Sequence, residues 1–279
     1  MPRSIPAISS GQPSSLIGLR AQIQAIERGG ANRPATVMPL GVAALDRCLA
    51  GGGLALGRVH EVIGEARSEV RDAASFGFVA ALLSRLMKND GDVLWCPRGS
   101  NPHGGMLSPR GLVALGLNPR RIIVAEARDD IDRLWAMEEG LGCSGLVAVV
   151  AELGPVRPGR ESKDSVNCRR LQLAAEASGV TGVLLRPDAG VAISSIGTPE
   201  TRWRVTVAPW AQAETDGVQD WRPRWHAELL RARNGRPGRV DLIWGAGHGV
   251  FHEVDQSMAT YQTPIRSSRL LAGVERSAA

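Results

Sequence analysis

The stretch that decides the fold is Gly57-Arg-Val-His-Glu-Val-Ile-Gly64, which is followed by Glu65-Ala-Arg-Ser-Glu-Val-Arg71. The first part is an apolar segment that ends in glycine, and from Asp72 onward the pattern is that of a long apolar helix. A strand, a loop opened by glycine and a helix in this order are typical of a phosphate-binding loop. We therefore expect a strand over 58–63 and a helix over 72–89.

The loop lacks the residues that carry nucleotide chemistry. The working pattern is G-x-x-x-x-G-K-[ST], in which the second glycine opens a nest of backbone N–H groups, the lysine reaches the β- and γ-phosphates and the hydroxyl holds Mg²⁺. Counted from Gly64, the chain has Glu69 for the second glycine, Val70 for the lysine and Arg71 for the hydroxyl residue. The sequence therefore predicts a phosphate-loop fold without its nucleotide site.

Electrostatics indicates how serious these replacements are. Two unit charges in contact interact by ~1 kcal/mol in water and by ~4 kcal/mol at an effective dielectric constant near ~20. Loss of the lysine and gain of the Glu69 carboxylate should therefore weaken polyphosphate binding by orders of magnitude. Arg67 and Arg71 offset part of this loss and leave weak anion binding open. Because nothing here holds Mg²⁺, we expect no cofactor, no metal site, no catalytic residue and no enzyme activity.

Composition narrows the class of protein. The 279 residues carry a net charge of +5 and 33 Lys and Arg residues, of which only Lys88 and Lys163 are lysines. This charge fits nucleic-acid binding and biased arginine usage equally well. The four cysteines are widely spaced, no apolar run is long enough for a membrane span, and the first residues lack the apolar core of a signal peptide. We expect a cytoplasmic, nucleoid-associated protein.

Apolar segments with strand and helix periods alternate along most of the chain, which predicts an α/β fold with parallel strands and crossover helices. The last three strand candidates have no helix between them and should form an antiparallel edge. In the second helix we expect Ile131, Leu134 and Trp135 to face inward. The strands are expected at 58–63, 92–96, 121–125, 146–151, 180–185, 202–207, 226–231 and 240–244, and the helices at 72–89, 129–139 and 165–178.

Both ends of the chain are expected to differ from the core. Residues 1–35 should comprise a disordered start, an amphipathic helix and a Gly- and Pro-containing linker, and residues 255–279 a mobile tail. The core domain should span 36–254. The helix carries one apolar stripe, which docks either on its own domain or on a partner chain. The candidate partner-binding residues in these two ends are Leu16, Leu19, Ile23, Ile26, Arg266, Arg269, Leu270 and Leu271.

The order of these segments resembles the core of RecA-type recombinases. The similarity is most specific over 37–46 and 51–64, which match the recombinase residues before the phosphate loop almost position by position, and it continues through 115–124, 146–152 and 244–250. It covers about residues 37–254. The resemblance implies a RecA-like core, in which a mostly parallel sheet is flanked by helices and ends in an antiparallel C-terminal edge.

A RecA-like core with this degenerate loop resembles the ImuA family of bacterial mutagenesis cassettes. The resemblance implies a non-catalytic adaptor in DNA-damage-induced translesion synthesis, the SOS mutagenesis response. Its implied partners are an ImuB-like Y-family protein, the error-prone DNA polymerase III alpha subunit and RecA itself. Two alternatives stay open: a SulA-like cell-division inhibitor, and a RecA-class ATPase in which Arg71 replaces the charge of the lysine.

Two further catalytic positions of recombinases support the adaptor. The segment Trp95-Cys-Pro-Arg-Gly-Ser100 contains no acid where recombinases carry the glutamate that activates water. Glu152 follows the apolar run 146–151, where a Walker B acid would stand, and is either a remnant metal ligand or a polar residue at the exit of a buried strand. We favour the second interpretation because the loop is already degenerate.

Several surface residues are candidates for binding. Direct DNA binding is expected to be weak or indirect, because one of the two loops that contact DNA in recombinases has three cations and the other has none. Trp210 and Trp221 flank a polar loop and are candidates for a protein interface, whereas Trp203 and Trp225 should lie in the core, with Arg202 and Arg204 facing water. The candidate nucleic-acid residues are Arg157, Arg160, Lys163, Arg233 and Arg236, and the last two flank Asn234-Gly235, which predicts a β-hairpin turn.

Overall fold

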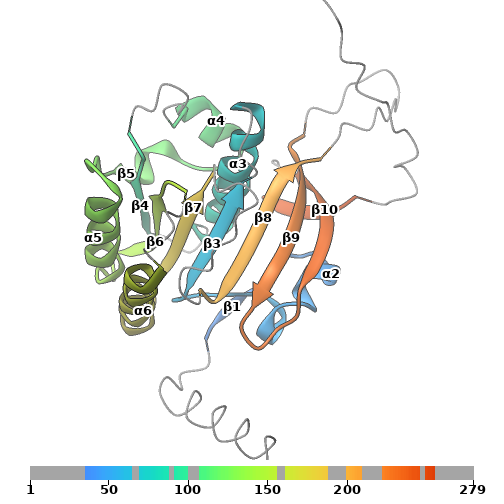
Figure 1. The fold of residues 1–279 in the computed structure, drawn as a ribbon. Helices are drawn as coiled ribbons and strands as arrows, with labels where there is room; N and C mark the ends of the chain where they lie inside the picture. Colours follow the sequence, from blue (N-terminus) through green and yellow to red (C-terminus); the bar gives the residue numbers. More distant parts are fainter. Residues whose placement is uncertain are drawn as a thin grey trace, which may run out of the picture.

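A computed structural model describes residues 35–64, 69–87, 91–99, 107–155, 161–187, 199–208, 222–245 and 249–254. Its centre is a nine-stranded sheet in the order β11-β10-β9-β8-β3-β7-β6-β4-β5 (Figure 1). The strands are β3 (Val59–Gly64), β4 (Asp92–Cys96), β5 (Ile122–Val124), β6 (Leu146–Glu152), β7 (Thr181–Arg186), β8 (Thr201–Val207), β9 (Arg224–Ala232), β10 (Gly238–Gly245) and β11 (Val250–Glu253). A small antiparallel pair, β1 (Val37–Met38) and β2 (Leu54–Ala55), precedes it.

The sheet has two halves that meet at β8. Strands β3 to β7 are all parallel, and β8 pairs parallel with β3 on one side and antiparallel with β9 on the other. Strands β9, β10 and β11 then continue antiparallel. The expected α/β fold with a mostly parallel sheet and an antiparallel C-terminal edge is therefore confirmed.

Helices lie against both faces of the sheet. Helix α3 (Glu69–Leu86) lies against one face and contributes Phe78, Val79 and Leu83 to the larger core, while α5 (Asp130–Leu141) and α6 (Glu161–Ser178) lie against the other face (Figure 1). Two short helices, α2 (Ala43–Asp46) and α4 (Pro109–Ala114), were not anticipated from the sequence. Both faces of the parallel half are thus buried, which explains why its strands read as continuous apolar runs.

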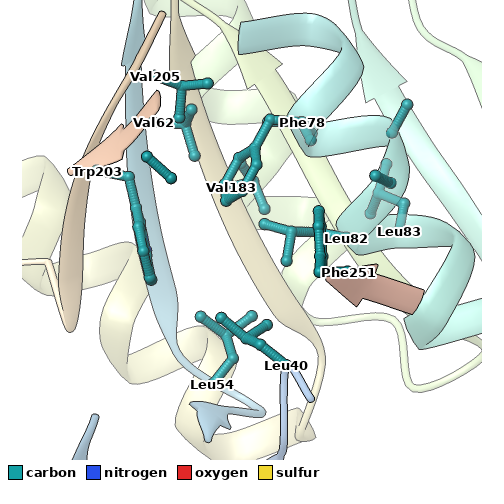
Figure 2. Packing of buried hydrophobic residues seen from close by; sticks show 14 of the residues in the cluster. Leu40, Leu54, Val62, Phe78, Leu82, Leu83, Val183, Trp203, Val205 and Phe251 are labelled. Carbon is teal, nitrogen blue, oxygen red and sulfur yellow. The ribbon is translucent and has the colours of Figure 1, made fainter. Parts of the chain in front are cut away.

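Aromatic side chains fill the core between α3 and the antiparallel half. Phe78 lies at ring-centroid distances of 5.8 Å from Trp203, 6.0 Å from Trp225 and 5.6 Å from Phe251. Figure 2 shows Phe78, Trp203 and Phe251 in this cluster. Trp244 packs on Phe251 with centroids 4.8 Å apart. The expectation that Trp203 and Trp225 lie in the core is confirmed, because both are buried.

The structure corrects two expectations about orientation. Ile131 and Trp135 do not face inward, since each is 63% exposed. The packed face of α5 instead includes Arg133 and Gly140, which a hydrophobicity pattern does not count; a Cβ on Gly140 would lie 2.6 Å from Leu94 Cδ2. Arg202 does not face water either. It is buried because β8 lies inside the sheet, with Glu61 of β3 directly opposite.

The turn between β9 and β10 follows the sequence expectation. Asn234 has a φ of 56°, in the left-handed region that Asn and Gly tolerate, and Gly235 follows it. The two strands pair antiparallel from Leu229 opposite Gly238 onward. The predicted hairpin at Asn234-Gly235 is confirmed.

Candidate functional site

In α/β folds with parallel strands, ligands bind at the carboxyl ends of the strands, so the candidate site is the carboxyl edge of β3, β4, β6 and β7. Gly64 is the last residue of β3. A Cβ added to Gly64 would lie 2.3 Å from the carbonyl oxygen of Pro187, the residue after β7. The glycine is therefore required by close backbone packing, whether or not a phosphate ever binds beside it.

The residues that replace the phosphate-loop signature begin the next helix. Glu69, Val70 and Arg71 form the first turn of α3, and their side chains lie outside the structural description, as do residues 65–68. A valine at the lysine position supplies no charge in any conformation. The loss of the cation is therefore a property of the sequence, and the position of the helix does not change it.

Glu152 ends β6, and both of its carboxylate oxygens are used within the protein. Oε1 accepts a hydrogen bond from the indole Nε1 of Trp95 at 2.6 Å, and Oε2 accepts one from the backbone N–H of Arg98 at 3.0 Å. Burial raises the pKa of Glu152, and the bond from the Arg98 amide opposes that rise. A carboxylate held by two fixed donors is a buried polar residue at a strand exit, in line with the interpretation favoured from the sequence.

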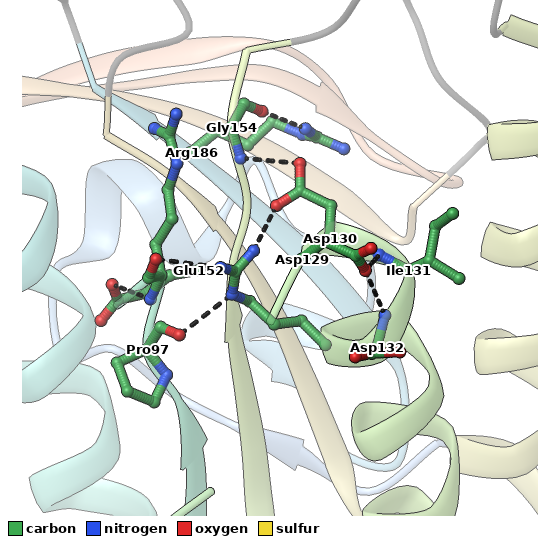
Figure 3. Close-up of polar contacts among 10 residues, drawn as sticks. Pro97, Asp129, Asp130, Ile131, Asp132, Glu152, Gly154 and Arg186 are labelled. Carbon is green, nitrogen blue, oxygen red and sulfur yellow. Dashed lines mark hydrogen bonds and ion pairs between the residues drawn. The ribbon is translucent and has the colours of Figure 1, made fainter. Parts of the chain in front are cut away.

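Arg133 fixes the segment after β4. Its Nε donates to the carbonyl oxygen of Pro97 at 3.0 Å, and its Nη2 donates to that of Arg98 at 2.9 Å. Its Nη1 pairs with Asp130 Oδ1 at 2.6 Å, and Asp130 Oδ2 accepts from the N–H of Gly154 at 3.2 Å. The start of α5 thereby joins the ends of β4 and β6, at the place where recombinases present the water-activating glutamate (Figure 3).

A buried charge cluster continues this network under β3. The Glu61 carboxylate accepts from Arg186 Nε at 3.1 Å and from Arg202 Nε at 2.5 Å, and all three side chains are less than 10% exposed. Arg186 Nη1 also donates to the carbonyl oxygen of Gly154 at 2.6 Å. Charges this deeply buried must be paired, so the cluster binds three strands into one unit.

Among the described residues of this edge, no other group offers an obvious chemical role. Burial raises the pKa of the Cys96 thiol to about 11, so the thiolate needed for a nucleophile is disfavoured at neutral pH. Within the described ranges, no three His, Cys, Asp or Glu residues are grouped so that they could hold a metal ion. Among the described helices, none is long and apolar enough to cross a membrane.

The three nucleic-acid candidates that the structure describes lie at opposite edges of the sheet. Lys163 lies in the first turn of α6, at the carboxyl edge of the parallel strands, and its side chain is outside the description. Arg233 and Arg236 lie in the β9–β10 hairpin at the amino edge, where the N–H of Arg233 donates to the carbonyl of Glu200 and the N–H of Arg236 donates to that of Cys48. These three residues therefore do not form one continuous basic path.

All ten of the predicted partner-binding residues lie outside the described ranges. Together with two of the nucleic-acid candidates, which lie outside them as well, they are Leu16, Leu19, Ile23, Ile26, Arg157, Arg160, Trp210, Trp221, Arg266, Arg269, Leu270 and Leu271. Sequence reasoning missed Arg133, Arg186 and Glu61. The sequence did contain one signal, because Glu61 lies within the apolar strand β3 and Arg186 ends the apolar strand β7. Charged residues in such strands are expected to be paired.

Comparison with known proteins defines the class. The crystal structure of the RadB recombinase matches with a TM-score of 0.52 at 17% sequence identity, covering 77% of this chain and 99% of that chain. At that identity the likeness concerns the fold, and the fold is RecA-like. No family model matches the chain.

Sequence relatives define the family. Protein ImuA from each of two strains of Caulobacter vibrioides is 37% identical to this chain over 229 residues, covering 79% of this chain and 88% of the relative. The chain therefore belongs to the ImuA family.

Proposed function

We propose that this protein is a non-catalytic RecA-like adaptor in DNA-damage-induced translesion synthesis. The observation that carries the proposal is the kinship with ImuA, combined with a phosphate loop in which Glu69, Val70 and Arg71 replace the glycine, lysine and hydroxyl residue. The expected partners are an ImuB-like Y-family protein and the error-prone DNA polymerase III alpha subunit, with RecA as a further contact. The expected contribution is to bring these partners together.

The carboxyl edge supports an adaptor over a motor. A motor must rearrange this edge around Mg²⁺ and the γ-phosphate in each cycle. Here Glu152 is held by Trp95 and Arg98, and Arg133 holds two successive carbonyl groups of the same segment. Such a network favours one fixed arrangement, because each broken bond leaves a buried polar group without a partner. A fixed edge suits a protein that acts through its binding surfaces and does not go through a nucleotide-hydrolysis cycle.

The partner claim is tested by affinity capture from cells after DNA damage. The full chain is compared with one chain that lacks residues 1–30 and another that lacks residues 255–279. We expect the full chain to retain an ImuB-like protein and one truncated chain to lose it, which would assign the docking segment. Capture of a tubulin-like division protein in place of an ImuB-like protein would overturn the proposal in favour of a division inhibitor.

A further inference from the structure

Helices α5 and α6 lie side by side, and each carries exposed apolar side chains (Figure 1). On α5, Ile131 and Trp135 are each 63% exposed, and on α6, Val166 and Leu173 are 62% and 47% exposed. Each pair lies on one helix face, since the spacings are four and seven residues. We call these four residues the α5–α6 patch.

An ion pair joins the two halves of this patch. Arg170 of α6 reaches Glu138 of α5 with Nε at 3.1 Å and Nη2 at 2.8 Å from the two carboxylate oxygens. Trp135 precedes Glu138 by about one turn, and Val166 precedes Arg170 by about one turn. Both helices lead from a strand's carboxyl end to the next parallel strand, so they run in the same direction. Trp135 and Val166 therefore lie at about the same level on the two neighbouring helices.

The chain enters the described domain at the C-terminal end of α6. The N–H of Leu56 donates to the carbonyl of Thr36 at 2.7 Å, so Thr36 lies beside the β2–β3 turn. Gly57 of that turn packs on the end of α6, because an added Cβ would lie 3.0 Å from Gly179 Cα and 3.3 Å from the carbonyl oxygen of Ala175. Whatever precedes Thr36 therefore starts next to the helix that carries half of the patch.

Chain length brings the N-terminal apolar stripe within reach of the patch. Residues 29–34 span at most roughly 20 Å when extended. Along α6, Leu173 lies about 9 Å and Val166 about 20 Å before Gly179 at a rise of about 1.5 Å per residue. A segment that ends at Arg28 can therefore lie along the whole patch without straining its connection.

We propose that residues 14–28 dock on the α5–α6 patch of their own chain. The segment presents four apolar residues with helical spacing, and exposed apolar side chains on two neighbouring helices can pack against such a stripe. The short connection gives the segment a high effective concentration at the patch, so docking within the chain precedes docking on a second copy. The apolar residues of the segment are Leu16, Leu19, Ile23 and Ile26.

Cross-linking of introduced cysteines tests the contact. Cys143 is exposed and the other three cysteines are buried, so a Cys143→Ser background leaves the surface free of thiols. The pair Ile23→Cys and Leu173→Cys is treated with a short bismaleimide, and the matched control replaces Leu173→Cys by Val113→Cys, an exposed apolar position on α4. We expect a cross-link within one chain for the first pair and none for the control. Cross-links only between chains, or none at all, would overturn the proposal.

Limited trypsin digestion tests the same contact in a protein without cysteines introduced for cross-linking. The double variant Trp135→Glu and Leu173→Glu places charges on the patch, and Val113→Glu is the control. We expect cleavage after Arg20 and Arg28 to become about tenfold faster in the double variant, corresponding to a loss of about 1.4 kcal/mol of docking free energy. Equal cleavage rates in the double variant and the control would contradict docking on this patch.

Discussion

Different kinds of interaction stabilise the two halves of the sheet. In the antiparallel half, β8 to β11 bury an aromatic cluster against α3, and the stabilisation is non-directional. At the carboxyl edge of the parallel half, directional bonds join Glu61, Arg133, Glu152 and Arg186 to backbone and side-chain partners. The comparison teaches that polar side chains of the scaffold can satisfy one another at the carboxyl edge of the parallel strands, while apolar packing holds the other half.

The largest effect is expected in the aromatic half. Trp203 is fully buried and packs on Phe78, so Trp203→Ala should lower the free energy of unfolding by about 3–5 kcal/mol through lost burial and the cavity left behind. Urea denaturation measures the change. Val113→Ala on α4 is the control, and its exposed side chain should change stability by less than about 0.5 kcal/mol. Similar losses for both variants would contradict the assigned core.

The next effect tests the buried charge cluster. Glu61→Ala leaves Arg186 and Arg202 buried without their carboxylate, so we expect a loss of about 3 kcal/mol. The control is Glu228→Ala, which removes the more exposed partner of Arg204 and should cost less than about 1 kcal/mol. Equal costs in urea denaturation would show that the Glu61 cluster is not buried as described.

A pH-dependent effect is expected at the seam between the halves. His60 of β3 is buried; its Nε2 donates to the Ala55 carbonyl, and its Nδ1 accepts from the Thr201 hydroxyl, which makes it neutral. Burial lowers the pKa of His60 from 6.5 to about 4. As the pH falls, His60 takes up a proton in the unfolded chain before it does so in the folded protein. Its contribution to stability is therefore fully present above pH 6.5 and is lost as the pH drops toward 4.

Comparison of unfolding free energies at pH 7 and pH 5 measures this contribution. For the native sequence we expect His60 to contribute about 2 kcal/mol of difference between the two pH values. The contribution of His60 should be lost in His60→Gln and persist in His252→Gln, because His252 is exposed. An equally large fall in stability from pH 7 to pH 5 in His60→Gln would locate the titrating group elsewhere.

The smallest effect is expected for Glu152→Gln. The Gln side chain points its N–H₂ group at one of the two donors, Trp95 Nε1 or the Arg98 N–H, so that donor loses its acceptor. The expected loss of unfolding free energy is about 1 kcal/mol at pH 7. Because burial raises the pKa of Glu152, ionisation lowers native stability as the pH rises above 4.5. The difference in unfolding free energy between the native protein and the variant should therefore become smaller from pH 5 to pH 7. A difference that becomes larger would contradict the raised pKa.

Much of the architecture could be predicted because it depends on local patterns. The strand–helix order, the hairpin at Asn234 and the burial of Trp203 and Trp225 follow from periodicity and turn chemistry over a few residues. The short strand β11 and helices α2 and α4 were missed, since elements of four to six residues carry too little periodic signal.

The polar network at the candidate site could not be predicted, because its partners are far apart in sequence. Glu61 meets Arg186 across 125 residues and Arg202 across 141 residues. Only the strand order β8-β3-β7 brings them together. The inward orientation predicted for Trp135 failed for a related reason: Arg133 occupies the packed face of α5 by bonding to backbone carbonyls, which no hydrophobicity pattern anticipates.

Calorimetric titration of the full chain with Mg·ATP tests most directly whether this RecA-like fold lacks a nucleotide site. With valine at the lysine position and Glu69 beside it, we expect no saturable heat up to about 1 mM nucleotide. A Kd in the micromolar range that depends on Mg²⁺ would contradict the loss of the nucleotide site and would favour a RecA-class ATPase.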